Sequence, residues 1–325
     1  MIDRFHRKVD YMRISVTDRC NLRCEYCMPA TGMDWIPREE ILSYEEIVRF
    51  VKEVAVPLGI RKIRLTGGEP MVRKALPTLV SQLAAIPEIT DLAMTTNGMF
   101  LAKEAGAYRE AGLKRVNISL DSLRADRFKA ITRGGDLARV WAGVEAAIES
   151  GLTPVKLNVV VMRGFNEDEL TDFVQLTIDK PIHVRFIEFM PVGDYERFAE
   201  LGYVSSQAMR EAITIPLAPT EPAVPGNGPA RYWTAPGALG TVGFISQMSH
   251  DFCQSCNRIR LTADGKIRHC LLSDHEIDVR ELLRESAAPA IIQQAIDEDL
   301  QLKAERHSGV EGISEHKRTM SQIGG

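Results

Sequence analysis

The chain has 325 residues, which is enough for one large domain or two. About 45% of the residues are hydrophobic and 26% are charged, as in ordinary globular proteins. The net charge of −4 gives no general attraction for nucleic acid or acidic membranes, so an anionic ligand needs a locally basic cleft. The polar start, Met1–Lys8, and the lack of a long apolar run lead us to expect a cytoplasmic protein without signal peptide or membrane span.

Strand-like and helical patterns alternate six times over the first 190 residues or so. The predicted strands are Tyr11–Val16, Lys62–Thr66, Asp91–Thr95, Arg115–Leu120, Val155–Val161 and His183–Phe189. Ser43 and Glu46 have the spacing of a capping box before a helix that stops at Gly59. Further helices are expected at Ala102–Ala111 and Val140–Ser150. This rhythm predicts a parallel α/β architecture, either an incomplete barrel or a doubly wound sheet.

The rhythm breaks after Pro191, where a second portion of the chain begins. Leu217–Pro229 is rich in Pro, Gly and Ala, which is typical of a loop or linker. The expected elements beyond it are short strands at Arg231–Thr234 and Thr241–Gln247, a hairpin of Arg258–Thr262 and Lys266–Cys270 that turns at Asp264-Gly265, and helices at Val279–Glu285 and Pro289–Ala304. A polar tail ends the chain.

Six cysteines form two triplets, which in a reducing compartment indicate metal sites rather than disulfides. The first triplet, Cys20, Cys24 and Cys27, follows the first predicted strand with the spacing C-x-x-x-C-x-x-C. Three thiolates can hold three corners of a cubane cluster and leave the fourth iron open to a ligand. A structural zinc site is the alternative, but it needs a fourth ligand, and His6 is the only nearby histidine.

The second triplet comprises Cys253, Cys256 and Cys270. Three histidines are close to it in the sequence: His250, His269 and His275. A C-x-x-C pair with a later cysteine and a neighbouring histidine suits a structural zinc site as well as an iron–sulfur cluster. Spacing alone therefore leaves both interpretations open.

The first triplet resembles the hallmark motif of the radical S-adenosylmethionine superfamily. The resemblance implies a 4Fe-4S cluster whose open iron chelates the methionine part of S-adenosylmethionine, and a 5′-deoxyadenosyl radical that the protein positions and shields. The residues that match superfamily cofactor contacts are Tyr26, Gly68, Ser119 and Met190. Taken singly, Gly68 suits a plain turn, Ser119 a helix cap and Met190 a core position. Together they lie at the carboxyl ends of predicted strands, where α/β barrels gather their chemistry.

The sequence around the second triplet resembles one family of that superfamily. Phe252–Lys266, Arg13–Cys20 and the terminal Gly324-Gly325 are similar to the GTP 3′,8-cyclases (MoaA type) of molybdenum cofactor biosynthesis. The resemblance spans nearly the whole chain and implies a second 4Fe-4S cluster whose open iron contacts guanine. It also implies conversion of GTP to (8S)-3′,8-cyclo-7,8-dihydroguanosine 5′-triphosphate, which begins with removal of the ribose 3′ hydrogen. An electron donor and a downstream cyclic pyranopterin synthase are the implied partners.

Basic residues inside apolar strands supply the charge that a triphosphate needs. They are Arg13, Arg64, Lys156 and Arg185. Such charges are costly unless they face a cleft or form ion pairs. No P-loop motif is present. The resemblance implies substrate contacts at Arg13, Arg64, Thr95, Lys156, Arg258, Ile259 and Arg260, to which we add Arg185.

The polar tail has the composition of a disordered end. The resemblance instead implies that it reaches the active site, with Gly324 and Gly325 acting there together with Arg258 and Arg260. We therefore predict an incomplete (β/α)6 TIM-like barrel over residues 1–190 and a carboxy-terminal extension, residues 191–325, that closes its open side. We expect a monomer or homodimer.

Two rivals remain at this stage. A radical S-adenosylmethionine enzyme that modifies a peptide and carries an auxiliary cluster shares the first motif, but it does not explain the basic residues. A zinc-binding module that recognises nucleic acid or protein is disfavoured by the negative net charge and by an aromatic content of 6%.

Overall fold

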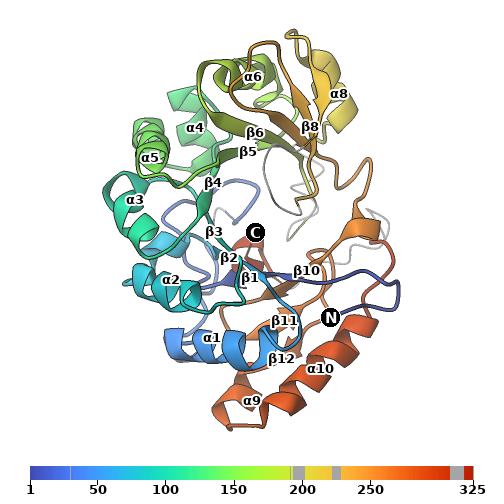
Figure 1. The fold of residues 1–325 in the computed structure, drawn as a ribbon. Helices are drawn as coiled ribbons and strands as arrows, with labels where there is room; N and C mark the ends of the chain where they lie inside the picture. Colours follow the sequence, from blue (N-terminus) through green and yellow to red (C-terminus); the bar gives the residue numbers. More distant parts are fainter. Residues whose placement is uncertain (30, 191, 193–201, 222–227, 308–317, 325) are drawn as a thin grey trace.

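Six parallel strands form the centre of the computed structural model, which describes residues 1–29, 31–190, 192, 202–221, 228–307 and 318–324. The strands are β1 Tyr11–Ser15, β2 Lys62–Thr66, β3 Asp91–Thr96, β4 Arg115–Ser119, β5 Val155–Val161 and β6 Ile182–Glu188. Each pairs in parallel with the next, and all six strand predictions are confirmed to within one or two residues. Together with the strands that flank them, the six strands form an open arc, which does not close on itself within the described part of the chain, so the prediction of an incomplete barrel is confirmed (Figure 1).

Helices cover the outer side of this arc (Figure 1). They are α1 Tyr44–Phe50, α2 Leu76–Ala84, α3 Leu101–Glu110, α4 Ala125–Thr132, α5 Leu137–Glu149 and α6 Leu170–Asp179. The predicted capping box opens α1, since the Ser43 side chain accepts from the Glu46 N–H and the Glu46 side chain accepts from the Ser43 N–H. The helix continues as a wider π-helical turn, Val51–Ala55, and the chain reverses at Gly59 with a φ of +96°.

Alternation along the strands separates a core face from a polar inner face. Met12 and Ile14 of β1 and Ile63 of β2 are at most 1% exposed and belong to the hydrophobic core beneath the helices. The next residue along each strand points to the opposite face. Arg13 and Arg64 therefore line a cavity on the inner side of the arc. This reversal explains why apolar strands carry regularly placed charges.

The carboxy-terminal portion extends the sheet at both edges. At one edge, β10 (Arg258–Leu261) pairs in parallel with β1 and is followed by antiparallel β11 (Lys266–Arg268) and β12 (Ile277–Asp278). The hairpin between β10 and β11 was predicted, and Gly265 at its turn has a φ of +76°. At the other edge, β9 (Val242–Ile245) pairs in parallel with β6.

One prediction in this portion is wrong. Leu217–Pro229 was expected to be a loop, but Ala218–Thr220 forms β7, which pairs with β8 (Arg231–Thr234) beside β9. Two of its three residues are exposed, so this edge strand lacks the apolar alternation that reveals a strand in sequence. Residues 222–227 of the same segment lie outside the described residues.

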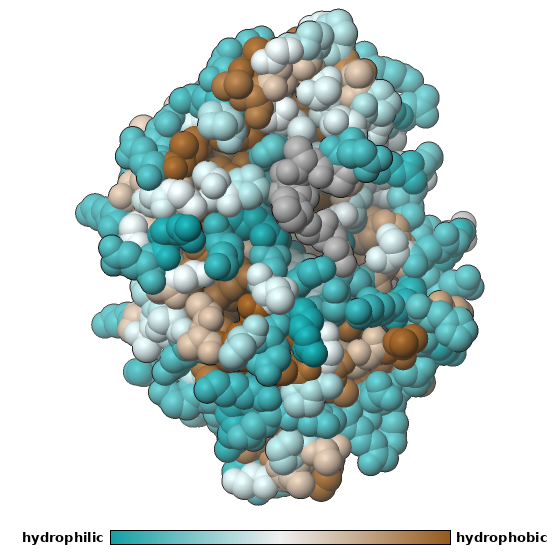
Figure 2. Space-filling model, viewed as in Figure 1, coloured by the Kyte–Doolittle hydropathy of each residue, from teal (hydrophilic) through white to brown (hydrophobic). Residues whose placement is uncertain are grey.

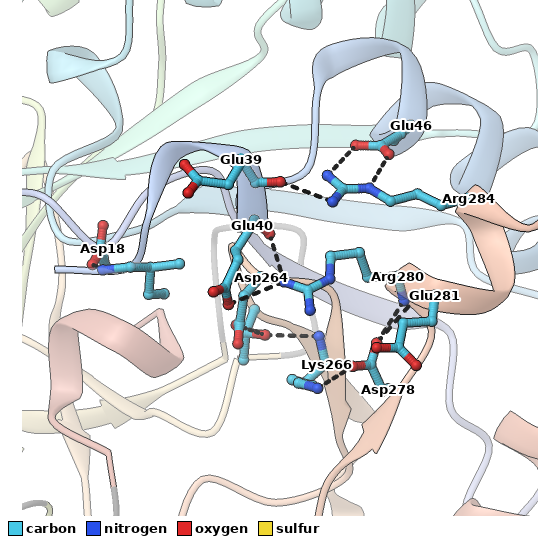
Figure 3. A network of polar contacts seen from close by, with 12 residues as sticks. Asp18, Glu39, Glu40, Glu46, Asp264, Lys266, Asp278, Arg280, Glu281 and Arg284 are labelled. Carbon is cyan, nitrogen blue, oxygen red and sulfur yellow. Dashed lines mark hydrogen bonds and ion pairs between the residues drawn. The ribbon is translucent and has the colours of Figure 1, made fainter.

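Charged contacts join helix α9 (Arg280–Arg284) of the carboxy-terminal portion to the start of the barrel (Figure 3). Arg280 Nη1 lies 3.2 Å from Glu40 Oε2, and Arg284 Nε lies 2.7 Å from Glu46 Oε1 of α1. The Glu46 carboxylate therefore serves both the capping box and the contact between the two portions. The remaining α-helices of the described chain are α8 Ser206–Ala212, α10 Pro289–Gln301 and α11 Met320–Ile323.

The surface is mainly hydrophilic on the face drawn in Figure 2, where apolar residues form scattered groups. The exposed large apolar side chains among the described residues are Ile2, Leu239, Ile291 and Leu302, of which Ile291 and Leu302 lie near opposite ends of α10. Isolated residues of this kind are normal on a globular protein. Within the described ranges, no helix has the length and apolar character needed to cross a bilayer.

Candidate functional site

A cavity of about 320 Å³ opens on the inner side of the sheet, between the two cysteine triplets. It is lined by all six cysteines and by Arg13, Tyr26, Arg64, Gly68, Thr95, Ser119, Lys156, Arg185, Met190, Arg258 and Arg260. The fold thus gathers residues that are spread over more than 250 positions of sequence into one site. Most of them come from the carboxyl ends or inner faces of parallel strands, where ligand sites of such sheets form.

The first triplet lies in the loop that follows β1. The Leu22 N–H donates to Cys20 Sγ at 3.3 Å, so the backbone is already turned toward this sulfur. Burial raises the pKa of the Cys20 thiol to about 11 and that of Cys27 to about 12. Buried thiolates need a cationic partner, and soft sulfur donors suit iron–sulfur clusters. The donor set of the first triplet therefore fits such a cluster.

Gly67 and Gly68 lie where a neighbouring backbone segment passes too close to leave room for a side chain. A Cβ on Gly67 would lie 2.4 Å from the Thr17 carbonyl oxygen, and a Cβ on Gly68 would lie 2.4 Å from that of Asp18. The Gly68 N–H donates to Thr17 O at 2.8 Å, which fixes the end of β2 against the segment leading into the cysteine loop. These glycines therefore do more than make a turn, because they set the distance between the two segments.

Two buried carboxyl groups stand beside the first triplet. Glu69 accepts hydrogen bonds from the Asn97 N–H at 2.6 Å and from Thr96 Oγ1 at 2.8 Å, yet burial raises its pKa to about 7. Asp121 accepts from the Tyr26 hydroxyl at 2.7 Å, and burial raises its pKa to about 6. Asp121 thereby orients the ring of Tyr26, which lines the cavity.

A row of cations crosses the inner face of the sheet. The strand register places Arg260 beside Arg13 and Arg13 beside Arg64, while Lys156 and Arg185 lie on β5 and β6. Burial and neighbouring arginines lower the pKa of Lys156 to about 6. Burial also lowers the pKa of Arg185 to about 10. So much buried positive charge in one cavity favours a polyanionic ligand.

Neutral polar groups lie within the same row. Arg185 donates twice to Asn158 Oδ1, at 3.0 and 2.7 Å, which fixes the plane of its guanidinium group. Thr95 Oγ1 and Asn117 Oδ1 are buried and have no hydrogen-bond partner within the described part of the chain. Both residues line the cavity, where a ligand would satisfy them.

The second triplet lies at the other end of the cavity, around the start of β10. Burial raises the pKa of Cys253 to about 11. Burial also acts to raise the pKa of Cys256, but the nearby charges of Lys303 and Arg258 outweigh it and lower that pKa. Among the described residues, no three His, Cys, Asp or Glu side chains surround a single point as ligands of one metal ion would. A cubane cluster does not require such convergence, because each thiolate binds a different iron.

The carboxy-terminal tail enters the site from the inner side of the arc, where α11 lies in Figure 1. The Gly324 carbonyl oxygen accepts hydrogen bonds from Arg260 Nη1 at 2.8 Å and from Arg13 Nε at 3.2 Å. Gly324 has a φ of +73°, and a Cβ there would lie 2.8 Å from Thr66 Cγ2. Residues 318–324 therefore do not have the disordered state that the composition of the tail alone suggests.

Comparison with known proteins agrees with this geometry. Residues 14–177 match the sequence model of the Radical SAM superfamily, and residues 182–309 match that of Molybdenum Cofactor Synthesis C. A GTP 3′,8-cyclase of Pelotomaculum thermopropionicum is 52% identical over 327 aligned positions, which cover 100% of both chains. Those of Moorella thermoacetica and Listeria monocytogenes are 50% and 49% identical and cover at least 98% of each chain.

The chain belongs to the GTP 3′,8-cyclase family. This family lies within the radical S-adenosylmethionine superfamily, and membership implies a 4Fe-4S cluster and S-adenosylmethionine.

Solved structures of lower identity share the fold. Streptococcus suis SuiB bound to S-adenosylmethionine is 14% identical and superimposes with a TM-score of 0.61 over 88% of this chain and 68% of SuiB. SuiB bound to its precursor peptide SuiA gives a TM-score of 0.56 over 97% of this chain and 76% of SuiB. Neither comparison bears on substrate, because sequence identity at this level supports the fold alone.

Most predicted site residues line the cavity, and Gly324 contacts two of its arginines through its carbonyl, while two further residues stand apart. The Ile259 side chain is 1% exposed within the hydrophobic core, so it faces away from the predicted substrate. Gly325 lies outside the described residues. Ser119 is not the cap of the following helix, because Arg124 occupies the N-cap of α4. Met190 is partly exposed at the cavity, which does not suit the alternative of a core residue.

The sequence interpretation missed several polar residues of the cavity. They include Glu69, Asn97, Arg115, Asn117, Asp121 and Asn158. Strand parity could have found Asn117, which is beside both Thr95 and Lys156 in the strand register. Arg115 and Asp91 form an ion pair at 2.5 Å on the same row, which only the pairing of β3 with β4 makes visible.

Proposed function

We propose that this chain forms the 3′,8-cyclo-7,8-dihydroguanosine triphosphate of its family from GTP, using the cavity described above. The net change in GTP is a new bond between C3′ and C8, with one hydrogen atom lost from C3′ and one electron and one proton gained by the guanine. The observation that carries the proposal is the single cavity in which two cysteine triplets flank a row of buried cations. A peptide-modifying enzyme would have no use for such a row.

The first triplet would hold the cluster that, with S-adenosylmethionine, supplies a 5′-deoxyadenosyl radical. The Gly68 N–H is engaged with Thr17, so its carbonyl is the group offered to the methionine ammonium. The ring of Tyr26, oriented by Asp121, would contact the adenine region. Ser119 and Met190 would complete the pocket for the cofactor.

The cation row would bind the triphosphate, mainly through Arg64, Lys156 and Arg185, with Thr95 as a neutral donor. The second triplet would hold a second 4Fe-4S cluster beside the guanine, close to Arg258. Arg13 and Arg260 would act together with the tail, whose Gly324 carbonyl they already bind. Ile259 would take part only through its backbone, because its side chain is in the core.

We extend the proposal to the wider setting of the enzyme. Residues 1–190 would form the barrel portion and residues 191–325 the portion that carries the second cluster. We propose a cytoplasmic enzyme, monomeric or homodimeric, that takes electrons from a low-potential donor. A cyclic pyranopterin synthase would consume the product. Nucleic acid and membranes are not among the proposed partners.

Metal analysis of two cysteine variants tests the two sites separately. Cys24→Ser should lose about half of the iron and all cleavage of S-adenosylmethionine. Cys256→Ser should lose the other half and all GTP cyclisation, but should retain cleavage of the cofactor. Zinc at the second triplet of the unmodified protein, or full turnover by either variant, would contradict the assignment.

A further inference from the structure

A buried lysine at the end of α10 touches the second cysteine triplet. The Lys303 side chain ammonium donates to Cys256 Sγ at 3.4 Å, to the Arg258 carbonyl at 2.8 Å and to the His269 carbonyl at 2.8 Å. Lys303 is 3% exposed. One ammonium group therefore reaches a predicted metal ligand, the strand that follows it, and the residue that precedes Cys270.

Arg7 contacts the segment of the remaining cysteine, Cys253, through the backbone. Its guanidinium group donates to the Cys253 carbonyl at 2.8 Å and to the carbonyls of Ala304 and Glu305, at 2.8 and 2.9 Å. Its Nε lies 2.5 Å from the Asp3 carboxylate, so this cation has its own counter-charge. Arg7 and Lys303 thus attach residues 303–305 to all three segments that carry the second triplet.

Lys303 differs from Arg7 in its electrostatic balance. It forms no ion pair with a carboxylate in the described part of the chain, and its acceptors are two carbonyls and a sulfur. The carboxylate one turn earlier, Asp299, is engaged with His275 Nε2 at 2.6 Å and His269 Nδ1 at 3.3 Å. A buried ammonium without a counter-charge is strongly destabilising. An iron–sulfur cluster held by three thiolates carries a net negative charge and would supply what is missing.

We propose that Lys303 is a positioning residue of the second triplet that also raises the reduction potential of the cluster bound there. The inference rests on the proposed function, because it requires an iron–sulfur cluster at that site. A cation that donates a hydrogen bond to a ligand sulfur stabilises the more negative, reduced state. Arg7 holds the Cys253 segment in place. Because its charge is balanced by the ion pair with Asp3, it does not replace Lys303 in raising the reduction potential.

The test compares Lys303→Met and Lys303→Gln with the unmodified, fully reconstituted protein. Iron per chain is measured, and the midpoint potential of the second cluster is followed by electron paramagnetic resonance during reduction. Cleavage of S-adenosylmethionine at the first cluster reports correct folding within the same molecule. Lys180→Met is the matched control, because Lys180 pairs with Glu145 on the surface and contacts no cysteine.

We expect both Lys303 variants to keep the first cluster active and to shift the second potential to more negative values. If Lys303→Met alone loses the second cluster, the positioning role is supported. The reduction potential is then measured in Lys303→Gln. An unchanged potential and iron content, or a positive shift, would overturn the inference and leave the proposed function intact. Zinc or no metal at the second triplet of the unmodified protein would overturn both.

Discussion

Gly324 sits where any side chain would collide with the barrel. Its Cβ would lie 2.8 Å from Thr66 and 3.1 Å from Ser15, and its φ of +73° already disfavours other residues. Gly324→Ala should therefore displace the carbonyl from Arg13 and Arg260, at a cost of about 1–2 kcal/mol. We expect product formation to fall by about tenfold or more, with iron content and cofactor cleavage unchanged.

Gly237 offers a matched control for backbone strain. It has nearly the same φ, +72°, but no atom lies within 4 Å of its Cβ position. Gly237→Ala should lower the free energy of unfolding by about 1 kcal/mol and leave turnover unchanged. Equal turnover by the two alanine variants would show that the Gly324 contact is not needed.

If Lys156 binds the triphosphate as proposed, the affinity for GTP should depend on pH in a characteristic way. Its pKa is lowered to about 6 by burial and by the neighbouring arginines, so in the empty site it is mostly neutral at pH 7. A triphosphate favours the ammonium form, so binding above pH 6 requires uptake of a proton. The affinity for GTP should fall as the pH rises from 7 to 9, by up to about tenfold per pH unit.

The variant Lys156→Met tests whether Lys156 causes this pH dependence. Because the variant has no ammonium to protonate, its affinity should be lower at pH 7 and nearly constant up to pH 9. Calorimetry in buffers of different ionisation enthalpy measures both the affinity and the proton uptake. The same slope in both proteins would assign the pH dependence to another group.

At the scale of single residues, the sequence was informative where chemistry needs a fixed spacing. Both cysteine triplets were found in this way, whereas the cations Arg13, Arg64 and Lys156 were found from their place inside apolar strands; all of them line the cavity. Ile259 was predicted as a substrate contact because it lies between Arg258 and Arg260 in the family motif. Side chains alternate between the two faces of β10, so that of Ile259 points into the core. Lys303 was missed because a lysine near the end of a polar helix gives no sign of burial in the sequence alone.

The short helix α11 owes its place to a charged anchor at its start. Arg318 Nη2 lies 2.8 Å from Asp264 at the β10–β11 turn and 2.8 Å from Glu276. The side chain is 16% exposed, so these hydrogen bonds are only partly screened. A helix of four residues has too few internal hydrogen bonds to persist without such contacts.

Arg318→Met should release this helix from the barrel. Charge-assisted hydrogen bonds of this kind are worth about 1.5–3 kcal/mol. We therefore expect faster amide hydrogen exchange at residues 320–323 and a matching fall in GTP turnover. Arg284→Met is the control, because its pair with Glu46 is more exposed and is worth at most about 1 kcal/mol. Equal exchange and turnover in the two variants would show that Arg318 does not anchor the tail.

At the scale of elements, the six barrel strands could be predicted because each has a long apolar face. The edge strand β7 could not, because its residues are mostly exposed. The hairpin of β10 and β11 was predicted from its turn, but its parallel pairing with β1 was not. That pairing is a long-range contact for which the local sequence carries no signal.

At the scale of the whole molecule, the two portions share one sheet and one cavity. β10 brings the second triplet to one side of β1, while the loop after β1 holds the first triplet. The distance between the two sites is thus set by a single strand of the barrel. The sequence indicated two candidate metal sites, but only the folded sheet shows that both cysteine triplets line the same cavity.

The most direct test of this account uses GTP that carries deuterium at C3′. The reconstituted protein is incubated without oxygen together with this GTP, S-adenosylmethionine and a low-potential one-electron reductant. The account predicts 5′-deoxyadenosine with one deuterium and an equal amount of a GTP isomer that has lost it. Cleavage of the cofactor without transfer of deuterium, and without the isomer, would contradict the assignment of GTP as the molecule held in this cavity.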